Sequence, residues 1–251
     1  MISFSSRSVL VTGGSRGIGA ATARLFARAG ANVAIGYHEQ VDTATAVLHQ
    51  CRSYKVSAIA LRADIAKRAE VETMVQEVVN EFGSLDVLVN NAGIWKEAAI
   101  DEMTDAQLDE TLKVNLNSMF YFCTAAARQM KTQKSGVIVN ISSTAGQRGE
   151  PLHSHYAATK GAAISLTKSL AVELAPYGIR VNCVAPGWVD TDMSRPSLAS
   201  PEAEKILKTI PLGRVGTPDE IAGPILFAAS EWATFITGEV INVNGGAVLC
   251  G

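Results

Sequence analysis

Short runs of apolar residues alternate along the chain with longer segments in which apolar residues recur every three to four positions. The short runs are apolar at nearly every position, which is typical of strands buried on both faces of a sheet. The longer segments have the periodicity of amphipathic helices. Strands are predicted at 8–12, 32–36, 56–61, 86–90, 136–142, 180–185 and 239–243. Helices are predicted at 17–29, 40–51, 67–82, from 105 through an apolar stretch reaching 127, and at 155–175, 201–209 and 218–230.

Steady alternation of strand and helix indicates parallel pairing with right-handed crossovers. The fold class predicted is α/β, a doubly wound parallel sheet of the Rossmann type with about seven strands and helices on both faces. No linker rich in Pro, Gly or Ser divides the chain, so residues 1–251 are expected to form a single domain. The irregular segment near 187–217 is interpreted as a mobile flap over the substrate, because long irregular stretches inside a compact domain are usually functional.

Composition excludes several functional classes. The chain has 251 residues, with 22 basic and 24 acidic side chains that are not clustered by sign. This balance predicts neither a nucleic-acid partner nor a basic membrane-binding patch. No apolar run reaches the ~20 residues of a membrane span, and the first residues do not resemble a signal peptide. The four cysteines have neither metal-ligand spacing nor the density of a disulfide scaffold, so free thiols, no metal and a cytoplasmic location are expected.

A glycine-rich turn joins the first predicted strand to the first predicted helix. It reads Thr12-Gly13-Gly14-Ser15-Arg16-Gly17-Ile18-Gly19. Glycines let a backbone turn sharply and approach a diphosphate, and the helix N-terminus offers unpaired N–H groups to the anion. The spacing G-x-x-x-G-x-G differs from the common dinucleotide fingerprint, and no Walker lysine follows. A dinucleotide site is therefore predicted here, with an ordinary tight connection as the alternative.

The end of the second strand bears on which dinucleotide binds. NAD sites usually place a carboxylate there to bind the ribose hydroxyls. This strand ends in Tyr37 and His38, and Glu39 follows one position later. Arg16, with help from Ser15 and His38, is placed to bind a 2′-phosphate through its guanidinium. NADP(H) is predicted in preference to NAD(H).

Polar residues also follow the third and fourth strands, where ligands bind in this architecture. Asp64, followed by Ile65, is placed to accept a hydrogen bond from an adenine amino group; capping of the next helix is the alternative. The turn Asn91-Ala92-Gly93 lets the backbone lie against a ring or a ribose, and an ordinary Asn/Gly turn is the alternative.

Tyr156 and Lys160 lie four residues apart in a predicted helix and therefore on one face. Reduction of a carbonyl by hydride requires a proton for the developing alkoxide. A lysine ammonium ~5 Å from the phenolate is expected to stabilise it by ~3 kcal/mol, or about 2 pKa units. Ser142 or Ser143, at the end of the fifth strand, could bind the carbonyl oxygen. Asn115 either bonds backbone in the core or holds a water that relays protons to Lys160.

These motifs together resemble the short-chain dehydrogenase/reductase family over nearly the whole chain. The resemblance rests on Thr12-Gly13-x-x-x-Gly17-Ile18-Gly19, Asp64, Asn90-Asn91-Ala92-Gly93, Asn115, Ser143, Tyr156-x-x-x-Lys160 and Pro186-Gly187-x-x-x-Thr191. It implies a catalytic tetrad of Asn115, Ser143, Tyr156 and Lys160. It also implies that the Val189 backbone and the Thr191 hydroxyl contact the nicotinamide, and that Arg16 marks NADP preference.

Within the family, the chain is similar to 3-oxoacyl-(acyl-carrier-protein) reductases and related carbonyl reductases. The resemblance implies a small carbonyl substrate, an acyl carrier protein as a partner, and a homotetramer built partly on the helices near 105–130 and 155–175. Trp95 and Trp188 are interpreted as pocket walls or ordinary packing, and His153 and His155 as partly exposed loop residues. Two other functions remain open: an NAD(P)-dependent alcohol, sugar or steroid dehydrogenase working oxidatively, and a nucleotide-binding sensor without catalysis.

Overall fold

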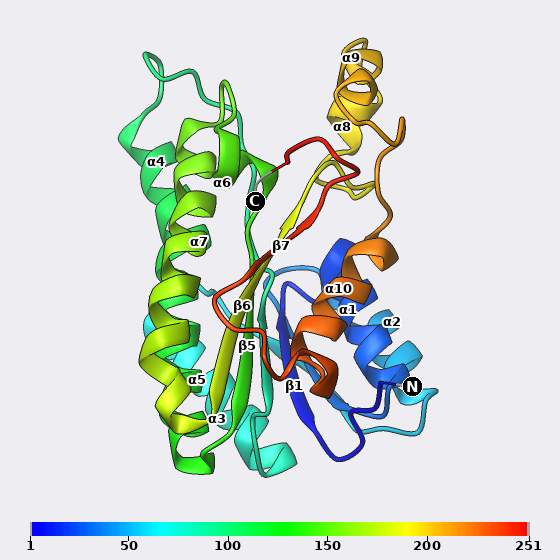
Figure 1. Cartoon of the computed structure of the whole chain (residues 1–251), viewed down its shortest axis with the longest axis vertical. Helices are drawn as coiled ribbons and strands as arrows, with labels where there is room; N and C mark the ends of the chain where they lie inside the picture. Colours follow the sequence, from blue (N-terminus) through cyan, green and yellow to red (C-terminus); the bar gives the residue numbers. More distant parts are fainter. Residues whose placement is uncertain (1, 250–251) are drawn as a thin grey trace.

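Seven parallel strands form one sheet in the computed structural model, which describes residues 2–249 (Figure 1). The order across the sheet is β3-β2-β1-β4-β5-β6-β7. The strands are β1 (Ser8–Thr12), β2 (Asn32–Tyr37), β3 (Ala58–Arg62), β4 (Val87–Asn90), β5 (Gly136–Ile141), β6 (Ile179–Pro186) and β7 (Val240–Val243). The predicted fold class is confirmed, because every strand pair is parallel and each crossover carries helix.

The helices occupy most of the expected ranges, with ends that differ by a few residues. They are α1 (Gly17–Arg28), α2 (Val41–Arg52), α3 (Arg68–Phe82), α4 (Asp105–Thr111), α5 (Ser118–Gln133), α6 (Thr144–Arg148), α7 (Ser154–Leu174), α8 (Arg195–Leu198), α9 (Ala203–Lys208) and α10 (Pro218–Ala229). The helix expected from 105 is interrupted by a π-helical segment, η1 (Leu112–Asn117). The short helices α6 and α8 have no counterpart among the predicted elements, since a single turn carries almost no periodic signal.

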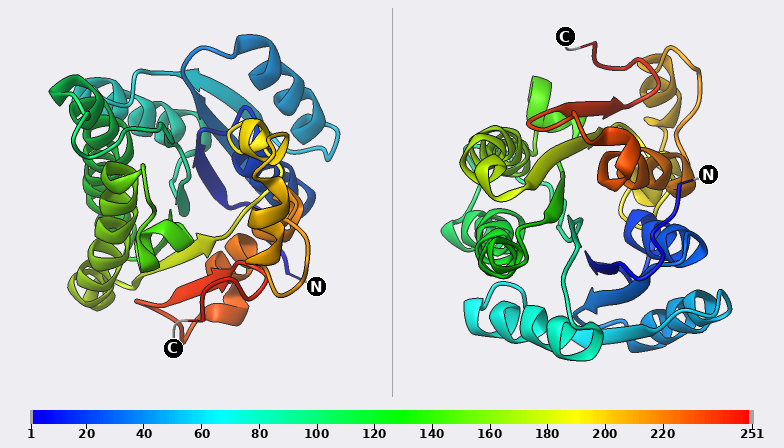
Figure 2. Two further views of the ribbon diagram at one scale, coloured as in Figure 1. Left: turned by 90° about the horizontal axis from the view of Figure 1, so that it is seen from above. Right: turned by 60° about the horizontal axis from the view of Figure 1, so that its bottom comes forward.

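Helices cover both faces of the sheet, as the sequence predicts. Figures 1 and 2 show α1, α2 and α10 on one face and α3, α5 and α7 on the other. Alternation along β1 sends Val9 and Val11 into the first core and Leu10 into the second. All three side chains have no exposed surface. Burial on both faces explains why the strands read as continuous apolar runs.

The sheet also fixes where a ligand can bind. The chain proceeds from β1 through β2 to β3 in one direction and from β4 to β7 in the other. Because β1 and β4 are neighbours, the loops that follow them leave toward opposite faces and open a crevice at the carboxyl edge. The glycine-rich turn follows β1 at this edge, and the Asn-Asn-Ala-Gly turn follows β4.

The segment expected to be a flap contains α8 and α9, which stand beyond the sheet at the upper right of Figure 1. Its two ends are joined by a bridge between Val189 and Gly216. The Asp190 N–H donates to the Gly216 carbonyl at 2.9 Å, and the Gly216 N–H donates to the Trp188 carbonyl at 2.9 Å. The segment is thus anchored as a loop at its base, and its mobility stays a prediction.

Three of the four cysteines lie in the described part of the chain, and all three are buried free thiols, as expected: Cys51, Cys123 and Cys183. Cys250 lies outside the described residues. Within residues 2–249, no helix is both long and apolar enough to cross a bilayer.

Candidate active site

A cavity of about 1030 Å³ opens over the junction between β1 and β4. Loops from the carboxyl ends of β1 to β6 contribute to its lining. Pockets for single small molecules span about 300–1,000 Å³, so this volume accommodates an extended ligand as well as a small one.

The phosphate-binding turn has the properties that an anion requires. Gly13 and Gly17 have φ of 63° and 52°, a left-handed conformation that favours glycine. A Cβ on Gly19 would lie 2.2 Å from the Gly13 carbonyl oxygen, so only glycine allows this close turn. Arg16 occupies the N-cap position of α1, and its side chain makes no capping hydrogen bond. The N–H groups of the first helical turn are therefore placed for a diphosphate.

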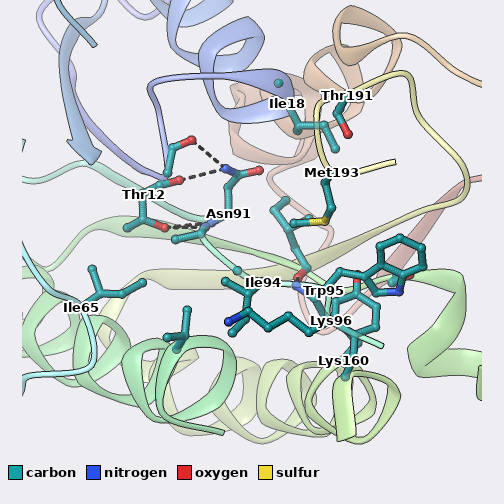
Figure 3. Close-up of a pocket in the computed structure, with 18 of the residues that line it drawn as sticks. Thr12, Ile18, Ile65, Asn91, Ile94, Trp95, Lys96, Lys160, Thr191 and Met193 are labelled. Atoms are coloured by element: carbon teal, nitrogen blue, oxygen red, sulfur yellow. Dashed lines mark hydrogen bonds between the residues drawn. The ribbon is translucent and has the colours of Figure 1, made fainter. Parts of the chain in front are cut away.

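The turn after β4 is held against the turn after β1 by a set of hydrogen bonds (Figure 3). The Thr12 hydroxyl accepts from the backbone N–H groups of Asn91 and Ala92, both at 3.0 Å. The Asn91 amide donates to the carbonyls of Thr12 at 2.9 Å and Gly13 at 3.2 Å. Both amide hydrogens of Asn91 are thus engaged in shaping the cavity, where the sequence suggested a direct ligand contact.

The far end of the cavity is lined by Tyr37, His38, Asp64 and Ile65, all expected cofactor contacts. The strand β2 ends at Tyr37, so no carboxylate stands at its end. The Asp64 carboxylate accepts from the Ala66 N–H at 3.1 Å, which closes the turn before α3. The alternative role of Asp64 as the cap of this helix is wrong, because the N-cap residue of α3 is Lys67 and no side chain caps it. The place of Asp64 on the cavity lining leaves it available to a ligand.

Arg16 lines the same part of the cavity and lies opposite the flap. One of its guanidinium nitrogens, Nη1, is 3.9 Å from the carboxylate of Asp192. Asp192 also accepts from Arg195 at 2.7 Å. The Arg16 guanidinium therefore faces both the cavity and Asp192, an acidic residue of the flap.

Tyr156 and Lys160 both line the cavity from the N-terminal part of α7. The Lys160 Nζ lies 5.7 Å from the centroid of the Tyr156 ring. The ammonium donates to the Ile141 carbonyl at 2.8 Å, which orients it beside the end of β5. The side chain of Lys160 is buried, and that of Tyr156 is half-buried.

The pKa of Tyr156 departs from the expectation drawn from the sequence. Lys160 was expected to lower it, but burial of the hydroxyl and the charge of Glu150 raise it to about 12, against a lowering by the hydrogen bond with Ser143. The expected direction is wrong for this structure, because burial disfavours the charged phenolate and Lys160 is not among the groups that shift this pKa. Burial also lowers the pKa of Lys160 to about 8, while Cys183 raises it.

Ser142 and Ser143, at the end of β5, have different environments. The difference indicates which of them could bind a substrate carbonyl oxygen. The Ser142 hydroxyl donates to the Lys160 carbonyl at 2.7 Å and is buried. The Ser143 hydroxyl is at the N-terminus of α6, where it accepts from the Ala145 N–H at 3.1 Å. The Ser143 hydroxyl also forms a hydrogen bond with the Tyr156 hydroxyl, so Ser143 is the better placed of the two to act together with Tyr156.

Asn115 lies within η1, whose π-helical turn displaces this residue from the regular helical repeat. Its amide donates to the Ile94 carbonyl at 2.9 Å, and its oxygen accepts from the Ile94 N–H at 2.8 Å. A Cβ on Gly93 would lie 3.2 Å from the Asn115 oxygen and 3.7 Å from the Lys160 Nζ. Asn115 therefore sits directly behind the site, bonded to backbone, and the water relay stays a prediction.

Residues after β6 close the remaining side. Pro186, Gly187, Val189 and Thr191 line the cavity, as the resemblance implies for the nicotinamide end. A Cβ on Gly187 would lie 2.9 Å from the Cα of Asn244, so the chain passes close to the segment after β7 here. The Ser194 hydroxyl donates to the Val189 carbonyl and fixes the start of the flap.

An aromatic and acidic wall completes the cavity, and sequence reasoning found only part of it. Trp95 and Trp188 line the cavity with ring centroids 5.8 Å apart, which supports their interpretation as pocket walls. Glu150, which no motif marked, accepts from the Trp95 indole N–H at 3.1 Å. His153 and His155 are buried, so their expected exposure is wrong. His153 stacks on Trp95 at 4.3 Å.

Within the described part of the chain, no cluster of His, Cys, Asp or Glu has the geometry of a metal site. The fold and the site thus define a nucleotide-binding α/β oxidoreductase with a tyrosine, a serine and a lysine on the lining of its cavity.

Comparison with known proteins gives the family. The family model described as enoyl-(acyl carrier protein) reductase matches residues 13–248. The chain is 44% identical to the 3-oxoacyl-(acyl-carrier-protein) reductase FabG of Staphylococcus aureus strain Mu50 over 96% of this chain and 98% of that protein. It is 43% identical to the protein of the same name from Chlamydia muridarum, over 96% of this chain and 97% of that protein.

Among solved structures, a short chain dehydrogenase from Burkholderia cenocepacia J2315 in complex with NADP superposes with a TM-score of 0.91 at 37% identity. The superposition covers 97% of this chain and 98% of that chain. The protein belongs to the short-chain dehydrogenase/reductase family and is an oxidoreductase that uses a nicotinamide cofactor.

Proposed function

We propose that the protein reduces a ketone to a secondary alcohol with NADPH, and that 3-oxoacyl thioesters are its substrate class. The observation that carries the proposal is the meeting of Tyr156, Ser143 and Lys160 on one cavity whose other end is an uncapped helix N-terminus. A dinucleotide bound along this cavity would be held by the turn 13–19 at its diphosphate and by residues 186–191 at its nicotinamide.

When bound, the nicotinamide would supply the hydride for the carbonyl carbon. The carbonyl oxygen then gains negative charge and takes the proton of the Tyr156 hydroxyl. The pKa of about 12 keeps that hydroxyl protonated at neutral pH, which is the state a proton donor requires. The Ser143 hydroxyl donates a hydrogen bond to the same oxygen and stabilises the developing charge.

Lys160 has two tasks in this scheme. With a pKa of about 8 it is mostly protonated at neutral pH, so its ammonium stabilises the Tyr156 phenolate that remains after proton transfer. Its donation to the Ile141 carbonyl keeps it in place between the tyrosine and the cofactor end of the cavity. Asn115 acts as a positioning residue, because its two bonds to Ile94 fix the loop that borders Lys160.

NADP(H) is proposed over NAD(H) because Arg16 lines the cavity at the end where the adenosine ribose would lie. No carboxylate ends β2 to bind a free ribose 2′-hydroxyl. The complex of the Burkholderia relative with NADP adds support.

The choice of 3-oxoacyl thioesters, and of acyl carrier protein as their carrier, rests on the names of the 43–44% identical relatives. A direct test follows NADPH oxidation with acetoacetyl thioesters of coenzyme A and of acyl carrier protein, and with the matching crotonyl thioesters. We expect reduction of the acetoacetyl compounds, a lower KM for the carrier-protein form, and no reduction of crotonyl compounds. Preference for crotonyl thioesters would indicate enoyl reduction instead.

The catalytic assignment is tested by Tyr156→Phe, which removes the proton and keeps the ring. We expect kcat to fall about 100-fold or more, with NADPH affinity retained. Full activity in this variant would refute the mechanism. Tight NADPH binding by the wild-type protein without turnover of any carbonyl would indicate a nucleotide-binding protein without catalysis.

A homotetramer is proposed as the assembly. Phe120 on α5 is 47% exposed and Val172 on α7 is 79% exposed, which gives these two helices an apolar surface suited to a second copy. The cytoplasmic location expected from the sequence stays a prediction.

A further inference from the structure

One wall of the cavity combines flat aromatic surface with a carboxylate. Trp95 is fixed by three contacts: it stacks on His153 at an interplanar angle of 6°, meets Trp188 edge to face, and donates its indole N–H to Glu150 at 3.1 Å. The Ala98 N–H donates to the Leu152 carbonyl at 2.8 Å and joins the two loops that carry these residues. The wall is therefore built before any substrate arrives.

Glu150 brings a negative charge to this wall. Among the described residues, no basic side chain forms a salt bridge with it within 4.0 Å, and only one of its oxygens is bonded to Trp95. Lys96 and Arg148 also line the cavity, together with Arg16, Lys113 and Lys160. Lys96 is paired with Glu110 at 2.7 Å, and Arg148 is exposed.

The location of the Glu150 carboxylate is best described relative to Tyr156, the proposed proton donor. Glu150 lies in the turn that leads into α7: its carbonyl accepts from the His153 N–H at 3.2 Å, and Tyr156 is in the first turn of α7. Glu150, Trp95 and Tyr156 line the same cavity. A carbonyl that accepts the Tyr156 proton therefore lies in a cavity whose wall carries this carboxylate and the indole faces. A carboxylate accepts hydrogen bonds from hydroxyl and ammonium groups and repels anions. The indole face attracts ammonium groups as well.

We propose that Glu150 determines substrate specificity by favouring ketones that carry a hydroxyl or ammonium group next to the carbonyl and by disfavouring ketones with a carboxylate there. This inference rests on the proposed ketone reduction and refines it. A thioester is neutral beside its carbonyl, so 3-oxoacyl thioesters are compatible with the same wall.

Three small ketones of similar size test the proposal: hydroxyacetone, butanone and pyruvate, each with NADPH. We expect kcat/KM to fall in that order for the wild-type protein. Glu150→Gln keeps the shape and an acceptor for the Trp95 N–H but removes the charge. It should lower the ratio of hydroxyacetone to butanone about fivefold, the difference between charged and neutral acceptors. It should raise the ratio of pyruvate to butanone about tenfold, since a like charge is removed.

Butanone is the internal reference because it has neither a hydrogen-bond donor nor a charge. A change in the reactivity of Tyr156 that affects all ketones alike therefore cancels in the ratios of kcat/KM. Trp95→Phe is the second variant. It should reduce the discrimination among the three ketones while leaving the Glu150 charge in place. Glu231→Gln, an exposed acid of η3 (Glu231–Ala233) outside the cavity, is the matched control and should change neither ratio.

Equal use of pyruvate and butanone by the wild-type protein, or ratios that do not respond to Glu150→Gln, would overturn the inference. The wild-type order decides the question even if a variant does not fold. Reduction of acetoacetyl thioesters without reduction of any small ketone also overturns it while the proposed function stands. Failure to reduce thioesters and ketones alike would instead refute the proposed function.

Discussion

Replacing Arg16 with alanine should weaken the binding of NADPH and leave the binding of NADH nearly unchanged. Arg16 caps α1 through its backbone only, so the substitution removes the guanidinium without removing a capping hydrogen bond. A charge-assisted interaction with a 2′-phosphate contributes about 1.5–3 kcal/mol, which corresponds to a 10- to 150-fold increase in the Kd for NADPH. Arg16→Lys is the matched variant. It should show an intermediate loss of NADPH affinity, because it keeps the positive charge but cannot form the two parallel hydrogen bonds of a guanidinium.

Asp192 competes with the 2′-phosphate of NADPH for the Arg16 guanidinium. Its carboxylate lies 3.9 Å from the Arg16 Nη1, a separation at which two charges attract by about 1 kcal/mol in water and about 4 kcal/mol at an effective dielectric of 20. The two side chains are 56% and 49% exposed. Exposed pairs contribute about 0.2–1 kcal/mol, so Asp192→Asn should lower the Kd for NADPH by a factor of about five at most.

The assay is a fluorescence titration of each variant with NADPH and with NADH at one ionic strength of about 0.15 M, because screening changes the contribution of exposed charges. Equal weakening of both cofactors in Arg16→Ala would mean that the guanidinium serves the shared diphosphate or the fold. An unchanged Kd for NADPH would refute the assignment of Arg16 to the 2′-phosphate.

Three further predictions concern stability and assembly. The pKa of Lys160 is about 8 in the folded protein against 10.5 unfolded, so this group alone should raise stability by roughly 3 kcal/mol as pH rises between these values. The buried thiols of Cys51, Cys123 and Cys183 have raised pKa values and act in the opposite direction, so the measurement is the difference between the wild-type protein and Lys160→Met in chemical denaturation at pH 8 and 10. An identical pH dependence in both proteins would contradict the assignment. Asn115→Ala should lower the free energy of unfolding by about 1–3 kcal/mol, because it removes the partner of the part-buried N–H and carbonyl of Ile94; an unchanged thermal midpoint would show that water replaces the amide. Val172→Glu together with Phe120→Asp should convert a tetramer to smaller species in light scattering, and a native mass unaffected by both changes would exclude α5 and α7 from the interface.

Much of the fold could be predicted from the sequence, because its signals are local. Val9, Leu10 and Val11 are adjacent apolar residues that fill two cores, and such a run indicates a strand wherever it occurs. The glycine spacing of residues 13–19 and the four-residue spacing of Tyr156 and Lys160 are equally local, so the turn and the shared helical face followed directly.

The interruption of the helix after Thr111 was not predictable in this way. Nothing in the apolar pattern of residues 112–117 marks a π-helical turn, and the structure places it where Asn115 bonds the backbone of Ile94, 21 positions away. The partner of that hydrogen bond exists only once the loop after β4 lies beside the helix.

The sequence by itself determined most of the strands and helices and their parallel arrangement, since the apolar pattern within each element is local. The tertiary structure alone decided the electrostatics of the site. Glu150 is brought to Trp95 across 55 positions, and Asp192, from the segment after β6, is brought to Arg16 at the start of α1. The pKa of Tyr156 rises to about 12 because burial and Glu150 act on it together. The burial of a side chain and its interactions with charges depend on residues that are far away in the chain. The spacing of residues along the sequence does not give the distances between them in the folded protein.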